Sequence, residues 1–534
     1  MKKKLFTLLL MAAGTAGNAS AQWNTGATPV CIQPQLTTSD YEVCTPKMAR
    51  TADKKTWIAW KSWKVKMVNG INGSSVRTLL QLLDIDGKPQ FAEPIVINDH
   101  LTPTWWSEYA LCVAPDGSAI ITVADSRTEE DTYVDNSDSP QTFTPAIYKI
   151  DQQGNFLWGL DGVEFRDIHN SAFTNAYVVG DDTYFLFLKE DYENDGSAGL
   201  YMMRIDSDGV PAWSEPRLMT AGNTTKGQIL ALEDGEFLFF DDCPDGARVH
   251  RFDRDLNEVW GEPVIYDDHS YGGYEMNHYR IVSDGQGGAC VAFQRAMGQF
   301  SHNIRAQHIN GDGSLGFGLT GLDAYNADEY DHNYPSIAAN GETGEILVQF
   351  ASDLGETGEI RHQKFSYDGD YLYNEKGNTI ASKNSATSGG YFYGVRGVGA
   401  LPGGDWISIY TDIAGYNKAS IIVRRYDKDG TRVWTRTIGR DLGIDNMSYA
   451  VEPEAVYLIY RESQSNKQPG IKAFRIATDG TYNVDYTTGI ANVSEDIADG
   501  PRAIYDANGR QRQQLQRGLN IVRNADGTVQ KYMR

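Results

Sequence analysis

The 534-residue sequence lacks most of the features that identify a chemistry directly. Its five cysteines include no C-x-x-C pair, so a cysteine-bound zinc ion is not indicated. Basic residues are in deficit, 48 against 71 acidic residues, and the resulting net charge of −23 repels phosphate backbones. Beyond residue 20, no apolar run approaches the roughly 18 residues that a membrane-spanning helix needs. We therefore expect neither a nucleic acid partner nor a transmembrane segment.

Helical patterning is also scarce, because no stretch of useful length repeats its apolar residues about every 3.6 positions. Apolar material is nevertheless plentiful: 41% of the residues are hydrophobic and 11% are aromatic. That composition excludes a disordered or collagen-like chain. It favours a folded protein built without long helices.

The N-terminus predicts export. Lys2, Lys3 and Lys4 precede an apolar run over residues 5–11, and small residues follow up to an Ala-x-Ala site that ends at Ala21. A basic region, a short apolar core and such a site are typical of a secretory signal peptide, here residues 1–21. The alternative is an amphipathic N-terminal helix.

Export would place the cysteines in an oxidising compartment. Cys31 and Cys44 flank a short segment of the N-terminal arm, residues 22–44, and a disulfide between them would fix that arm. Cys112 and Cys290 stand in strand-like runs and are expected to be buried as small hydrophobic residues. The state of Cys243 is left open.

An internal repeat organises most of the chain. In its clearest copy, alternating apolar residues lead into an Asp-x-Asp-Gly turn at 206–209, and an aromatic residue, Trp213, follows four positions after the glycine. Further copies are 84–87 with Phe91, 151–154 with Trp158, 427–430 with Trp434, and the weaker 253–256 with Trp260, 310–313 with Phe317, 366–369 with Tyr373 and 477–480 with Val484. Asp-Gly between two alternating apolar runs predicts a β-hairpin, because glycine supplies the positive φ of the tight turn.

A second hairpin is predicted ahead of each copy. These hairpins centre on Asp53, Gly117, Asp181, Gly235, Gly285, Gly341, Gly403 and Pro453. Two hairpins per copy give four antiparallel strands, and eight such units predict an all-β propeller of eight four-stranded blades over residues 45–492. Because Val484 replaces the aromatic in the last copy, seven blades are the alternative. We expect each aromatic to fill the wedge between neighbouring blades, and Pro94, Pro216 and Pro263 to lie in outermost strands.

The Asp-x-x-Gly-x-x-x-Trp pattern is similar to the tryptophan-docking repeat of quinoprotein-like propellers. That eight-bladed superfamily includes PQQ-dependent alcohol dehydrogenases and the outer-membrane assembly propeller lipoproteins. The resemblance implies the fold. The chain lacks the adjacent cysteine pair and the calcium-ligand set of a PQQ enzyme, so no cofactor is predicted.

Residues 493–534 break from the repeat and turn basic. Three strand-like runs, 504–510, 517–523 and 526–531, resemble the C-terminal sorting signal of type IX secretion, although Asn520 stands where that signal has Tyr and the segment is shorter than usual. The resemblance implies an extracellular or cell-surface protein exported through the periplasm. The alternative is a terminal hairpin that caps the last blade.

Candidate ligand-binding residues lie in the irregular loops between blades, which a propeller gathers at the end opposite its hairpin turns. They are His100, Trp105, Trp106, His169, Asn170, His269, Tyr271, Tyr274, His278, Tyr330, His332, Tyr391 and Tyr393. Aromatic rings, amides and histidines are typical of a cleft for a glycan or a peptide at the mouth of the central channel. Two alternatives stay open: a metal site, though no pair has the spacing of a zinc motif, and loop histidines that only cap strand ends.

Two acidic insertions, 125–145 and 189–199, belong to the same end. They are expected to be solvated loops, with calcium binding or a carboxylate pair for glycan cleavage as alternatives. No catalytic residue is identified from the sequence, and whether the chain is an enzyme is left open. The favoured function is a monomeric, non-catalytic binding or adhesion module for a glycan or an extracellular protein. The alternative is a glycan hydrolase or lyase with its site at the channel mouth, and a quinoprotein dehydrogenase ranks third.

Overall fold

A computed structural model describes residues 23–25, 28–33, 42–68, 71–97, 108–127, 143–166, 173–189, 198–222, 227–233, 235–243, 246–268, 277–298, 301–325, 331–384, 388, 393–415, 418–464, 467–482, 490–492, 502–506, 511–512, 519–524 and 529–533. The predicted signal peptide lies outside them. No helix among these residues is long and apolar enough to cross a membrane.

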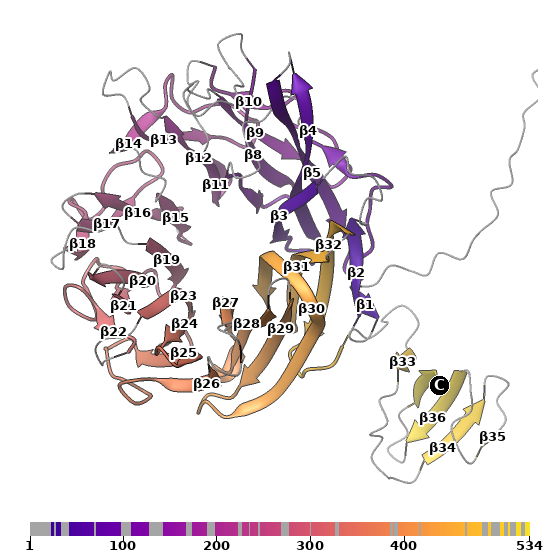
Figure 1. Ribbon diagram of the computed structural model, residues 1–534. Coiled ribbons are helices and arrows are strands. Elements are labelled where there is room, and N and C mark those ends of the chain that lie inside the picture. The colour runs from indigo at the N-terminus through magenta and orange to yellow at the C-terminus, as the bar shows by residue number, and fades with distance from the viewer. Residues whose placement is uncertain are drawn as a thin grey trace, which may run out of the picture.

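Eight antiparallel blades form a ring around a common axis (Figure 1), which confirms the predicted eight-bladed propeller. Blade 1 consists of β3 (Glu42–Arg50), β4 (Thr56–Val68), β5 (Ile71–Leu83) and β6 (Ile95–Val96), and blade 2 of β7 (Leu111–Val113), β8 (Ala119–Asp125), β9 (Thr144–Ile150) and β10 (Val163–Glu164). Blade 3 consists of β11 (Thr174–Val179), β12 (Asp182–Lys189), β13 (Gly199–Ile205) and β14 (Arg217–Ala221), and blade 4 of β15 (Gln228–Ala231), β16 (Phe237–Cys243), β17 (Gly246–Phe252) and β18 (Val264–Asp267).

Blades 5 to 7 continue the pattern. Blade 5 consists of β19 (Asn277–Ser283), β20 (Ala289–Gly298), β21 (Ser301–Ile309) and β22 (Leu322–Asp323), and blade 6 of β23 (Asp331–Asn340), β24 (Glu345–Asp353), β25 (Thr357–Ser366) and β26 (Asn378–Asn384). Blade 7 consists of β27 (Tyr393–Ala400), β28 (Trp406–Gly415), β29 (Lys418–Tyr426) and β30 (Arg432–Val451). A single 3₁₀ turn, Pro402–Gly404, joins β27 to β28.

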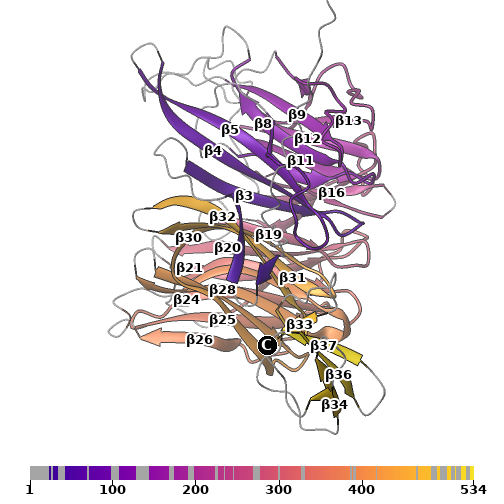
Figure 2. The ribbon, with the colours of Figure 1, turned by 90° about the vertical axis from the view of Figure 1, so that its right-hand side faces the viewer.

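Fifteen of the sixteen predicted hairpin turns join two strands of a blade at the predicted positions. After the sixteenth, at 477–480, the described residues form an isolated bridge between Ile476 and Tyr482 instead of a further strand. Because successive strands alternate in direction, the turns joining first to second and third to fourth strands share one end of the ring, called the turn face. The second-to-third hairpins and the connections between blades share the opposite end, called the loop face. In the side view the strands run roughly along the ring axis, so the two faces are well separated (Figure 2).

The N-terminal arm completes the eighth blade, which the sequence analysis did not anticipate. Strand β30 continues from blade 7 into blade 8, where it pairs with β31 (Ala455–Gln464), and β31 pairs with β32 (Lys467–Ala477). The outer edge of β32 then pairs antiparallel with β2 (Thr28–Gln33), which pairs with β1 (Asn24–Thr25). The two ends of the propeller segment therefore share one sheet, and the ring is closed by hydrogen bonds between them.

Neighbouring blades are joined by an aromatic side chain that packs on a glycine, as at the interface of blades 2 and 3. Gly209 lies in the turn of blade 3 with φ +87°, and a Cβ added to it would stand 2.5 Å from Cδ1 of Trp158, which belongs to blade 2. The Trp158 ring nitrogen donates to the Ser207 carbonyl at 3.2 Å. Glycine is required there both for its backbone angle and for the close approach of the ring.

Six other interfaces repeat this contact. They pair Trp23 with Gly87, Phe91 with Gly154, Trp260 with Gly313, Phe317 with Gly369, Tyr373 with Gly430, and Trp434 with Gly480. Each tryptophan in this set also donates its ring N–H to the turn carbonyl two residues before the glycine, at 3.0 to 3.2 Å. The aromatic residues thus fill the wedges between blades, as predicted, and the aromatic missing at Val484 is supplied by Trp23 of the arm.

The interface of blades 3 and 4 differs because Leu256 occupies the glycine position, with φ +65°. The side chain of Asp253 accepts hydrogen bonds from the backbone of Asp255 and Asn257, as Asp206 does from Asp208 and Val210 in the glycine-containing turn of blade 3. The guanidinium of Arg217 lies 4.3 Å from the centroid of the Trp213 ring. A cation–π contact therefore covers the aromatic residue at this interface.

The predictions for the cysteines have different outcomes. Cys290 is fully buried in β20, as predicted, whereas Cys112 in β7 is half-buried; both are free thiols. The side chains of Cys31, Cys44 and Cys243 lie outside the described residues, so the Cys31–Cys44 disulfide stays a prediction.

The prolines are displaced from their predicted place. Pro94, Pro216 and Pro263 each stand one residue before an outermost strand rather than inside it. At that point the missing N–H breaks no ladder hydrogen bond.

The C-terminal segment forms a separate five-stranded sheet outside the ring (Figures 1 and 2), with strand order β33-β37-β36-β34-β35. Its strands are β33 (Ile490–Asn492), β34 (Arg502–Asp506), β35 (Gln511–Arg512), β36 (Leu519–Asn524) and β37 (Val529–Met533). The three strand-like runs predicted in the tail correspond to β34, β36 and β37. Among the described strands, none of this sheet pairs with a blade, so the tail does not extend the last blade.

Candidate functional site on the loop face of blades 5 and 6

Only part of the predicted site can be placed. The side chains of His332 and Tyr393 are described, and His278 has its backbone in β19 while its side chain lies outside the described residues. The remaining ten predicted residues lie outside the described residues: His100, Trp105, Trp106, His169, Asn170, His269, Tyr271, Tyr274, Tyr330 and Tyr391. Most of the two acidic insertions, 128–142 and 190–197, lies outside them as well.

His332 is buried where blades 5 and 6 meet, with 2% of its surface exposed. Its Nδ1 is 2.8 Å from the Ser352 hydroxyl, and its ring lies 4.4 Å from the ring of Tyr325. The Nε2 atom is buried without a hydrogen-bond partner. Burial, reinforced by the charge of Arg361, lowers the pKa of His332 to about 4, because both disfavour the protonated ring. At neutral pH this histidine is an uncharged packing residue.

Tyr393 is half-buried in the first strand of blade 7. Its ring meets Tyr410 edge-on at 5.7 Å, and the ammonium of Lys383, which is paired with Asp412, lies 4.9 Å from its centroid. Burial and the nearby Asp412 carboxylate raise the pKa of Tyr393 to about 12. The phenol therefore stays protonated at neutral pH and can act as a hydrogen-bond donor.

A hydrogen-bonded network that the sequence analysis missed connects the two blades beside His332. We call it the mouth network; it consists of His302, Asp331, Asn333 and Gln294. The Nδ1 atom of His302 is 2.7 Å from Oδ1 of Asp331, and the other carboxylate oxygen accepts from the Asn333 amide at 2.6 Å. The Gln294 amide in turn donates to Oδ1 of Asn333 at 2.7 Å.

The topology places the mouth network on the loop face. His302 follows the hairpin that joins the second and third strands of blade 5, and Asp331 begins the first strand of blade 6. The side chains of His302 and Asp331 are 25% and 34% exposed, so the pair is within reach of solvent. Tyr334, one residue past Asn333, is 55% exposed and has φ +57°. A non-glycine residue with that angle is uncommon, and such strain concentrates at functional sites.

The arrangement fixes the roles of the His302 nitrogens. A carboxylate can only accept, so the proton of a neutral imidazole sits on Nδ1 and faces Asp331. This leaves the Nε2 lone pair available as an acceptor for a ligand hydroxyl or as a general base. Within the described residues, no three His, Cys, Asp or Glu side chains gather closely enough to hold a metal ion.

Comparisons with known proteins give only distant structural similarity. No protein-family model matches the chain, and no curated protein is detectably related to it. Among solved structures it is similar to the ulvan lyase of polysaccharide lyase family PL25, with 10% identity, TM-score 0.39, and 85% of this chain and 98% of that one covered. A protein of unknown function from Dyadobacter fermentans DSM 18053 gives 10% identity, TM-score 0.37, and 83% and 97% coverage.

A neuraminidase-like protein of subtype N10 from A/little yellow-shouldered bat/Guatemala/060/2010 gives 9% identity, TM-score 0.34, and 62% and 95% coverage. Identities and TM-scores this low carry no argument about activity. The chain has the architecture of an eight-bladed β-propeller, and its function must be argued from its own residues.

The depressed pKa of His332 predicts a pH effect with a definite sign. Its folded-state pKa, about 4, lies below the unfolded value of 6.5, so between these pH values only the unfolded chain takes up the proton. Stability should therefore fall as pH drops through this window. By NMR, the His332 ring should titrate near pH 4, and the His332→Gln variant should lose that resonance and show a shallower pH dependence of unfolding. A midpoint near 6.5 for this ring would contradict the buried placement.

Proposed function

We propose that the protein is an exported, non-catalytic binding module that holds a glycan on the loop face of blades 5 and 6. The observation that carries this proposal is the mouth network, in which the partly exposed His302–Asp331 pair presents imidazole and carboxylate groups and is held by the amides of Asn333 and the buried Gln294. These groups both donate and accept, which is what sugar hydroxyls require.

The scaffold supports this role. The network takes two residues from blade 5 and two from blade 6, and the Phe317–Gly369 contact fixes these blades against each other. Binding groups that are already held by hydrogen bonds lose little conformational freedom when a ligand arrives. The resemblance of the repeat to tryptophan-docking propellers supports the scaffold as well, and it names no reaction.

One observation favours a second candidate, a glycan hydrolase or lyase. His302 is oriented by Asp331 through a 2.7 Å hydrogen bond, with Nε2 left available. A histidine held in this way can abstract a proton, as a lyase requires, or activate water. The same pair would bind a hydroxyl group without reaction in the favoured function.

A glycan array and a product-release assay on the purified mature protein separate these functions. The Asn333→Ala variant removes an amide and should weaken glycan binding about tenfold, the effect of losing one or two hydrogen bonds. Gln286→Ala is the matched control, because it removes an exposed amide of the same blade 5 from the turn face.

The release assay decides between the two candidates. Binding without release of product is the expected result. Product formation that disappears in the His302→Ala variant would establish the enzyme instead. If Asn333→Ala and Gln286→Ala bind every array glycan as the wild type does, the mouth network is not a glycan site, and a protein ligand becomes the next candidate.

We also propose that the protein reaches the cell surface or the medium, with residues 493–534 acting as the sorting signal. Support comes from the predicted signal peptide and from the separate tail sheet, which shares no strand pairing with the described blades. Deletion of residues 493–534 should leave a folded propeller in the periplasm, measured by cell fractionation and by protease accessibility on intact cells. Normal surface exposure of the truncated chain would refute the sorting role.

A further inference from the structure

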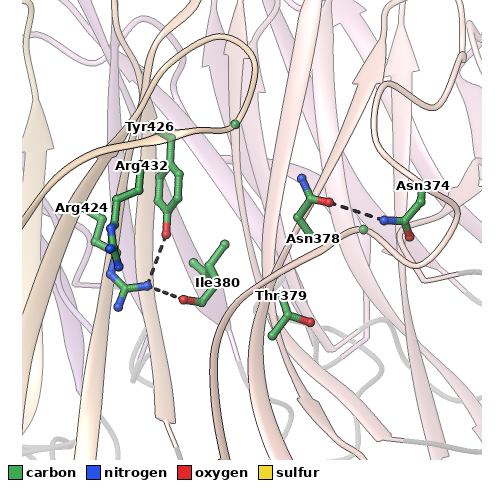
Figure 3. A pocket seen from close by; sticks show the side chains of 9 residues that line it. Asn374, Asn378, Thr379, Ile380, Arg424, Tyr426 and Arg432 are labelled. Carbon is green, nitrogen blue, oxygen red and sulfur yellow. Dashed lines mark hydrogen bonds between the residues drawn. The ribbon is translucent and has the colours of Figure 1, made fainter.

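A polar cleft of about 540 Å³ lies between blades 6 and 7 and shares no residue with the mouth network (Figure 3). One side is the start of the outermost strand of blade 6, with Asn374, Asn378 and Thr379. The other side is the third and fourth strands of blade 7, close to the turn face, with Arg424, Tyr426 and Arg432. The cleft has a volume typical of small-ligand sites.

Strand register brings the two arginines to one face. Arg424 and Tyr426 are two residues apart in β29, so their side chains point the same way, and Arg432 of β30 pairs directly with Tyr426. The Arg424 guanidinium donates to the Ile380 carbonyl and, at 3.3 Å, to the Tyr426 hydroxyl, as Figure 3 shows. Its Nε atom is buried without a hydrogen-bond partner. Arg432 is exposed and forms no ion pair with any described carboxylate.

The charge of the cleft is opposite to that of the protein. The chain carries a net charge of −23, yet the residues lining this cleft include two arginines and no Asp or Glu. The carboxylate tied most directly to the lining is Glu359, which accepts from Thr379 at 3.1 Å and already pairs with Arg361 at 2.7 Å. Asp427, next to Tyr426, is engaged by the backbone N–H groups of its own turn. Among the described residues, neither guanidinium group therefore forms an ion pair with a carboxylate.

We propose that this cleft binds the anionic group of an acidic saccharide, a carboxylate or a sulfate. Guanidinium groups recognise both anions through paired, charge-assisted hydrogen bonds. Beside them, the amides of Asn374 and Asn378 and the hydroxyl of Thr379 match the neighbouring sugar hydroxyls. Ile380 is the sole aliphatic side chain among the residues that line the cleft, which disfavours a peptide whose side chains need apolar contacts. The proposal does not depend on the mouth network.

Isothermal titration of the full mature chain tests it with three probes: an oligogalacturonate for the carboxylate, a sulfated galactan oligosaccharide for the sulfate, and a neutral oligosaccharide. Arg432→Gln and Arg424→Gln should each weaken binding of an acidic probe at least about tenfold, the effect of losing charge-assisted hydrogen bonds. Arg166→Gln is the matched control, since it removes the same charge from an exposed side chain of blade 2. It should bind as the wild type does.

The outcomes are distinct. Which acidic probe binds identifies the anion. Equal binding of the neutral probe, or unchanged affinity in the Arg432→Gln variant, would overturn the proposal. A glutamate-rich peptide serves as a fourth probe, and its binding more tightly than the saccharides would overturn the proposal as well. Arg432 is exposed, so its variant should keep the wild-type melting temperature even if Arg424→Gln does not fold. The Asn333→Ala variant should bind the acidic probe normally, which separates failure at this cleft from failure at the mouth network.

Discussion

The packing of an aromatic ring on a glycine of the next blade is the contact on which the rest of the structure depends. A single four-stranded sheet leaves both faces apolar, and it becomes stable only when neighbours cover them. Seven of the eight interfaces do so with one ring from one blade and one glycine turn from the next. The ring of blades has no natural end, so its last interface must use residues from both ends of the propeller. Trp23 provides that contact, with its ring N–H 3.0 Å from the Ile85 carbonyl and its ring meeting Tyr457 at 5.1 Å.

Because these contacts close the ring and fix the blades, polar sites can lie between blades without disturbing the fold. The mouth network lies on the loop face of blades 5 and 6, and the arginine cleft lies near the turn face of blades 6 and 7. Both occupy the boundary between two blades, where side chains from separate sheets converge. The docking contacts hold those boundaries fixed, so that groups such as His302 and Arg424 keep their geometry before a ligand arrives. The same scaffold therefore serves both proposed sites.

Local sequence patterns predicted the blades but not the contacts that join segments distant in the sequence. The Asp-x-Asp-Gly turns and their aromatics gave the strand number, the hairpins and the wedge role, because all three are encoded within short segments. Strand β2 could not be placed, since it pairs with residues of β32 more than 400 positions away; Val30, for example, lies opposite Ala473. The absent aromatic at Val484 was the signal that another segment must supply it. His302 and Asp331 are 29 positions apart in different blades, so no spacing rule could join them.

The most direct test of the docking account compares two glycines that share a backbone angle and differ in surroundings. Gly87 and Gly235 both have φ +82°, but a Cβ on Gly87 would stand 2.8 Å from the backbone nitrogen and 2.9 Å from Cγ of Trp23, whereas nothing lies within 4 Å of one on Gly235. Gly→Ala at either site adds the same backbone strain, so the difference between the two variants isolates the close contact with Trp23. The account predicts that Gly87→Ala lowers the free energy of unfolding by about 1–3 kcal/mol more than Gly235→Ala, as overpacking of a tight contact does. Equal destabilisation by the two substitutions would contradict it.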